Sequence, residues 1–119
     1  MKREIKFRVW DSKNKHWRND VVSLFNGAIS VDGYYPRNQM VVMQYTGNTT
    51  LHFVDIYEGD LVFFDDGLWV VRWDKLDAGF KYFGIDDKTK GKYTVVFAVE
   101  EIVGNIHENP ELFNKLKQL

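Results

Sequence analysis

The sequence has no cysteine among its 119 residues and no long apolar run. The absence of cysteine excludes a disulfide framework, a thiolate zinc site and a thiol nucleophile. No segment approaches the roughly 20 apolar residues of a membrane helix, and the opening "MKREIKFRVWDSK" has no signal-peptide core. We therefore expect a protein of the bacterial cytoplasm without a membrane partner.

Catalytic and metal-binding motifs are also missing. The glycines form no phosphate-binding loop, and no serine lies in a nucleophile elbow. The three histidines, His16, His52 and His107, form no closely spaced pair, although a site assembled from them through space remains open at this point. We predict that the chain is not an enzyme and uses no cofactor or metal ion.

Acidic residues are concentrated in "DIYEGDLVFFDDGLWVVRWD", residues 55–74, and we interpret them as residues that form turns. Gly59 is expected to have a positive φ, and Asp60 to accept a backbone hydrogen bond. Gly67 fits the left-handed position of a hairpin loop that joins two apolar strands. Asp65 and Asp66 fall in that exposed turn without the spacing of a calcium loop, so we predict no metal site there.

Charge is nearly balanced at −1 but unevenly distributed. Residues 1–18 carry seven basic side chains against two acids, whereas residues 55–66 carry five acids and no base. Either these are solvated surfaces, or the two regions attract each other, within one chain or between copies. The small net charge favours neither nucleic acid nor membrane as a partner.

Alternating apolar and polar residues predict an all-β, mainly antiparallel fold. An N-terminal hairpin and loop are expected over residues 1–39, with a further hairpin closed by Asn26-Gly27. Residues 40–107 are expected to form an SH3-like barrel core, including a short strand over Leu51–Val54. A C-terminal helix is predicted over residues 109–118, capped by Asn109. The whole chain then forms one domain.

Aromatic residues are abundant, at 16% of the chain with four tryptophans. A small domain cannot easily cover them all, so some are expected at an interface. The basic and aromatic "KFRVW" and "KHWR" also suit stacking on single-stranded nucleic acid. The candidate binding surface consists of Lys6, Arg8, Trp10, Trp17 and Arg18.

Five segments together carry a resemblance to a known family: "REIKFRVWD", "MQYTG", "IYEGDLVFF", "VVRWDKLDAGF" and "EEIVGNIHENPELF". In this order they resemble the YopX family of phage and prophage proteins. The resemblance implies an all-β fold and a phage or prophage gene, and it supplies no active-site residues. The chain departs from the family pattern at Leu51 and Phe53, where polar residues are usual, and this adds apolar surface.

These observations favour a non-catalytic protein-binding or self-assembling module. We expect a homo-oligomer, or a complex with a host or phage protein that the sequence does not identify. The alternative is a nucleic-acid-binding protein that uses the basic, aromatic N-terminal hairpin.

Overall fold

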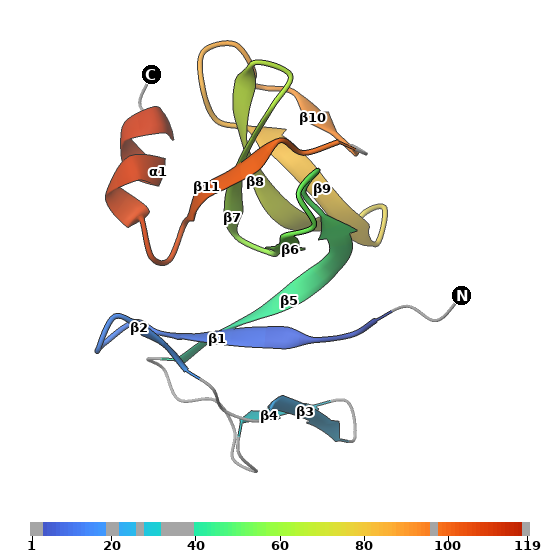
Figure 1. The fold of residues 1–119 in the computed structure, drawn as a ribbon, viewed down its shortest axis with the longest axis vertical. Helices are drawn as coiled ribbons and strands as arrows, with labels where there is room; N and C mark the ends of the chain where they lie inside the picture. Colours follow the sequence, from blue (N-terminus) through green and yellow to red (C-terminus); the bar gives the residue numbers. More distant parts are fainter. Residues whose placement is uncertain (1–3, 19–21, 26–27, 32–39, 96–97, 118–119) are drawn as a thin grey trace.

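In the computed structural model, the described residues (4–18, 22–25, 28–31, 40–95 and 98–117) form three antiparallel sheets and one helix (Figure 1). This confirms the all-β, antiparallel prediction. One long strand, β5 (Met40–Thr49), runs from the lower part of the molecule in Figure 1 to the upper part.

The four-stranded sheet has the order β2-β1-β5-β6. Its strands are β1 (Phe7–Asp11), β2 (His16–Arg18), β5 (Met40–Thr49) and β6 (Asp55–Tyr57). The separate two-stranded sheet joins β3 (Val22–Phe25) and β4 (Ala28–Val31). Phe25 pairs with Ala28, so the hairpin predicted around Asn26-Gly27 is confirmed in its strands, although those two residues lie outside the described ranges.

The five-stranded sheet has the order β10-β9-β8-β7-β11 and curls into a half-barrel. Its strands are β7 (Asp60–Phe64), β8 (Gly67–Asp74), β9 (Gly79–Gly84), β10 (Tyr93–Thr94) and β11 (Glu101–Asn105). The expectation of an SH3-like barrel over 40–107 is therefore met only as a half-barrel. The physical reason is strand pairing, because β5 hydrogen-bonds to β1 along Phe7–Asp11 and lies in the other sheet.

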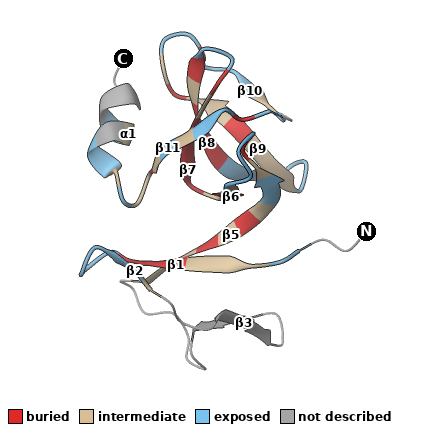
Figure 2. Cartoon of the chain, in the orientation of Figure 1, coloured by how far each residue is buried: buried red, intermediate tan, exposed pale blue. Residues whose placement is uncertain are grey.

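Apolar side chains cover both faces of β7 and β8, as their nearly continuous apolar sequences predicted. One face forms the interior of the half-barrel, built from Ile56, Val62, Phe64, Trp69, Val71, Tyr82 and Val99. On the other face, Leu61, Val70 and Ile85 pack with residues that include Phe113. Figure 2 shows this buried stretch in red through β7 and β8.

Phe113 belongs to the helix α1 (Pro110–Lys117). Pro110 occupies the first helical position, where its missing N–H costs no hydrogen bond. The amide oxygen of Asn109 accepts the Asn105 N–H at 3.1 Å, so this side chain holds the preceding turn, and the Asn109 carbonyl accepts the Phe113 N–H at 3.3 Å. No helix in the described residues is long and apolar enough to cross a membrane.

Two turns differ from the sequence-based expectation. Phe64 pairs with Gly67, so the β7–β8 loop consists of Asp65 and Asp66, and these two residues have φ values of 51° and 58°. Gly67 is not left-handed; it is required because a Cβ atom would overlap the Thr89 side chain. The segment 51–54, expected to be a strand, is a turn.

Replacing Gly84 by alanine is expected to destabilise the half-barrel by about 1–3 kcal/mol. A Cβ atom there would overlap the backbone carbonyl of Thr89, which cannot move as a flexible side chain can. Gly79→Ala is the matched control, since its Cβ would meet nothing closer than the Asp77 carbonyl oxygen at 3.8 Å. Urea denaturation of both variants measures the difference, and equal losses would contradict the packing argument.

Candidate binding site at the junction of the two sheets

Cations and aromatic rings of the predicted binding surface are brought together on the four-stranded sheet. The Arg8 guanidinium lies over both the Trp17 ring, at 4.6 Å, and the Tyr57 ring, at 4.5 Å. Trp17 contacts Trp10 edge-on, with ring centroids 5.0 Å apart. Trp10 is buried, whereas Trp17 remains 39% exposed. The surface is therefore a stack of side chains from β1, β2 and β6.

The cations of this surface also contact carboxylates of the same chain. Lys6 lies 2.6 Å from Asp55, and Arg8 forms an ion pair with Asp60. The basic N-terminal strand and the acidic segment 55–66 thus attract each other within one chain, which was one of the two alternatives left by the sequence. Arg18 similarly lies 3.5 Å from the buried carboxylate of Asp11.

Asp60 is fully buried at the point where β7 begins. Its carboxylate accepts the Tyr57 N–H at 2.8 Å as well as the Arg8 guanidinium. Burial raises the pKa of Asp60, while Arg8 and the Tyr57 N–H act in the opposite direction. Gly59 has a φ of 88°, so both predictions for this turn, the positive φ and the backbone hydrogen bond, are confirmed.

Two polar side chains hold turns through hydrogen bonds, and the role of Asp11 was not predicted from the sequence. Asp11 accepts the N–H groups of Lys13 and Asn14 at 3.0 and 2.9 Å, and these hydrogen bonds lower its pKa. Asn105 is buried and accepts the N–H groups of residues 107 and 108. An Asn or Asp two or three residues before a turn is the local signal for such hydrogen bonds.

A cleft of about 370 Å³ lies beside the Gly59 turn. It is lined by Glu58, Gly59, Val71, Arg72, Trp73, Lys75, Ile106 and His107. Burial raises the pKa of Glu58, and burial together with Arg8 and Arg72 lowers the pKa of His107. The cleft therefore combines two shifted titratable groups with two exposed cations.

The three histidines do not converge. His107 is half-buried in the cleft, whereas His16 and His52 are exposed on β2 and on the 51–54 turn. Within the part of the chain that the structure describes, no three His, Asp or Glu side chains are grouped closely enough to hold a metal ion. Asp65 and Asp66 are both exposed in their turn, and Asp66 pairs with Lys88 at 2.6 Å.

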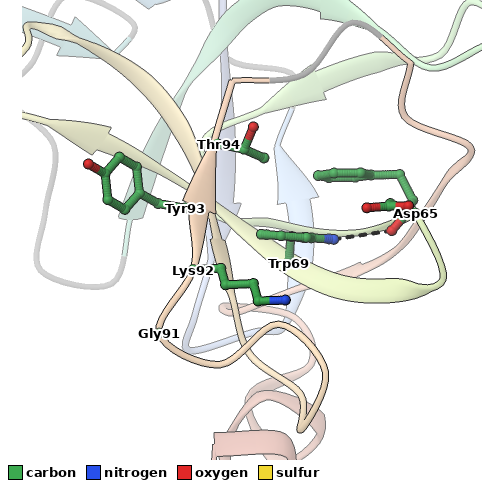
Figure 3. A pocket seen from close by; sticks show the side chains of 7 residues that line it. Asp65, Trp69, Gly91, Lys92, Tyr93 and Thr94 are labelled. Carbon is green, nitrogen blue, oxygen red and sulfur yellow. Dashed lines mark hydrogen bonds between the residues drawn. The ribbon is translucent and has the colours of Figure 1, made fainter.

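A second hollow, of about 580 Å³, lies between β10 and the β7–β8 hairpin. Trp69 stacks on Phe64 with centroids 4.7 Å apart and donates its indole N–H to the Phe64 carbonyl at 3.2 Å. Figure 3 shows Lys92 extending toward Trp69, whereas Tyr93 points to the other side of β10. Aromatic packing already occupies the base of this hollow, so it offers a ligand one cation and a narrow apolar surface.

Comparison with known proteins decides the family. The family model described as YopX protein matches residues 6–114. This chain belongs to the YopX family. The resemblance noted from the sequence is thereby confirmed over nearly the whole chain. The segments that carried it include those lining the cleft beside Gly59, namely "IYEGD", "VVRWDK" and "GNIHENP".

The structure is similar to the crystal structure of protein EF1440 from Enterococcus faecalis. The TM-score is 0.56 at 21% sequence identity, and the match covers 92% of this YopX family chain and 98% of the other. At this identity the likeness supports the fold and nothing further. None of the curated proteins matches this chain.

Arg8→Met is expected to destabilise the protein by about 3 kcal/mol, because it leaves the Asp60 carboxylate buried without its cation. Adding Asp60→Asn should recover part of that loss by removing the charge. Lys6→Met is the control, since its partner Asp55 is partly exposed, and it should cost less. Chemical denaturation of the three variants tests this, and a double variant no more stable than Arg8→Met would contradict it.

The lowered pKa of His107 predicts an acid-sensitive fold. The folded protein binds fewer protons at His107 than the unfolded chain does, so the free energy of unfolding should fall as the pH drops from about 7 to 5. His107→Gln should reduce this loss, whereas His52→Gln, at an exposed position, should not. Melting temperatures measured across this pH range provide the test, and parallel curves for wild type and His107→Gln would refute it.

Proposed function

We propose that this chain is a phage- or prophage-encoded, non-catalytic module of the host cytoplasm that self-associates through an exposed apolar loop. The apolar loop comprises residues 51–54. Leu51, Phe53 and Val54 are 56%, 86% and 53% exposed, so three of the four loop positions carry apolar side chains that face solvent. Adjacent exposed apolar side chains of this kind favour a protein interface.

The apolar loop is held in one conformation by hydrogen bonds at its base. Thr50 is buried, and its hydroxyl accepts the N–H groups of His52 and Val54 at 3.2 and 3.3 Å. The Thr50 N–H donates to the Val54 carbonyl at 2.8 Å, and the Leu51 N–H donates to the Val99 carbonyl at 2.9 Å. A loop that is already ordered loses less conformational entropy when it binds a partner.

The backbone of Phe53 supports a binding role most strongly. Its φ of 65° is left-handed, a conformation that costs a residue with a Cβ roughly 1–2 kcal/mol and suits glycine or asparagine better. A bulky aromatic side chain that is both strained and exposed adds nothing to the folded monomer that would offset this cost. An interface that buries the Phe53 ring offsets it.

A second copy of the chain is the binding partner that suits the apolar loop. A two-fold contact places the same surface of both subunits together, and an apolar surface is complementary to itself. The contact involves few residues on each side, so the affinity should be in the micromolar range or weaker. The cations that a nucleic-acid site would need, at Lys6, Arg8 and Arg18, instead contact carboxylates of the chain.

Replacing Phe53 by asparagine should abolish self-association without lowering the melting temperature measured at concentrations where both proteins are monomeric. Asparagine tolerates the left-handed backbone, so the variant should be as stable as the wild type or more stable. Leu76→Asn is the matched control, because Leu76 is 94% exposed on a different loop and should leave association unchanged. Light scattering over a concentration series, together with thermal melts, measures both properties.

A wild-type mass near 14 kDa at every concentration would refute self-association. If the monomer then bound single-stranded DNA with an affinity that falls steeply as salt increases, the nucleic-acid alternative would replace the proposal.

A further inference from the structure

Part of strand β8 has a partner on one side only. Its pairing with β9 continues to Asp74, opposite Gly79, whereas its pairing with β7 ends at Val70, opposite Leu61. One further hydrogen bond follows on the β7 side, from the Gly59 N–H to the Val71 carbonyl at 2.8 Å. Beyond Val71 the strand edge opens into the cleft described beside Gly59.

The alternation of hydrogen bonds along β8 identifies the free backbone groups. The Ile85 N–H donates to the Leu68 carbonyl, so even-numbered residues of β8 bond toward β9. The Val71 carbonyl bonds away from β9, to the Gly59 N–H. The backbone of Trp73, two residues later, faces the same side of the strand as that of Val71. The N–H and C=O of Trp73 are thus directed to the open edge, where no described strand pairs with them.

Side chains around this edge place positive charge on one wall of the cleft and a carboxylate on the other. Arg72 and Lys75 are exposed cations on the β8 side, and Arg72 also lies over the Phe113 ring at 5.7 Å. The Trp73 side chain is 42% exposed and contacts the Phe80 ring edge-on. The opposite wall carries Glu58, whose carboxylate disfavours a second acid on that side.

We infer that the cleft binds an extended acidic peptide, which adds a strand to the open edge of β8 at Trp73 and directs a carboxylate toward Arg72 and Lys75. Backbone pairing at a free strand edge supplies affinity, and the flanking side chains supply specificity. The cleft volume of about 370 Å³ suits a short peptide segment. This interaction is separate from the apolar loop and does not depend on self-association.

The probe is an acetylated and amidated Thr-Val-Glu-Val-Thr peptide, compared with a version in which lysine replaces glutamate and one with a single N-methylated peptide bond. Titration into ¹⁵N-labelled protein should shift the Trp73 backbone amide resonance and slow its hydrogen exchange. The glutamate peptide should bind about tenfold more tightly than the lysine peptide. N-methylation at the pairing position should abolish binding.

Charge reversal tests the two cations. Arg72→Glu combined with Lys75→Glu should invert the preference between the two peptides, whereas Lys88→Glu, at a lysine paired with Asp66 outside the cleft, should preserve it. The Phe53→Asn variant should bind the peptide as the wild type does. This last result separates the peptide site from the proposed self-association, since either one can fail alone.

Three outcomes would overturn the inference. An unperturbed Trp73 amide at millimolar peptide would mean that Arg72 and Lys75 only protect the strand edge from pairing. Equal affinity for the glutamate and lysine peptides would remove the acidic specificity. Displacement of the peptide by an oligothymidylate, with stronger salt dependence, would assign the cleft to nucleic acid instead.

Discussion

The buried ion pair between Arg8 and Asp60 connects the two main sheets of the molecule. Arg8 belongs to β1 in the four-stranded sheet, and Asp60 is the first residue of β7 in the half-barrel. Because the Asp60 carboxylate is buried, its free energy depends strongly on the presence of the guanidinium. The aromatic rings of Trp17 and Tyr57 around Arg8 limit the access of water to the pair.

The same turn determines the shape of the cleft. Gly59 precedes Asp60, donates its N–H to Val71 and accepts the Ile106 N–H at 3.0 Å. These bonds tie the turn to β8 on one side and to the segment after β11 on the other. A single glycine with a positive φ therefore places Glu58 and His107 across from the open edge of β8. The turn that connects the two sheets therefore also forms one wall of the cleft.

The distribution of charge and apolar surface supports our proposal of a protein partner over nucleic acid. Two of its N-terminal cations, Lys6 and Arg8, pair with carboxylates at the junction of the sheets. Among the described residues, the most exposed aromatic side chain is Phe53, on an apolar loop with no lysine or arginine in residues 50–56. Cations remain exposed beside the cleft, where they adjoin a free strand edge, which favours recognition of a peptide.

Several features of the fold could be predicted from residues that are close together in the sequence. Alternation of apolar and polar residues indicated strands, the continuous apolar runs of β7 and β8 indicated burial on both faces, and Glu58-Gly59-Asp60 indicated a turn with a positive φ. Each of these depends on residues near one another in the chain. The candidate surface around Arg8 was identified for the same reason, because charge and aromatic content alternate along β1.

Tertiary structure decided what the local pattern left open. The sequence of β5 suits either sheet equally well, and only pairing with β1 excludes it from the half-barrel. Gly67 satisfied the rule for a left-handed turn residue, yet contact with Thr89, 22 residues later, accounts for it instead. The partners of Arg8 and the cleft around His107 likewise join segments about 50 residues apart. The sequence by itself therefore determined strand content, turn chemistry and burial, whereas the tertiary structure alone decided which strands pair and which polar groups meet, because those depend on contacts between distant segments.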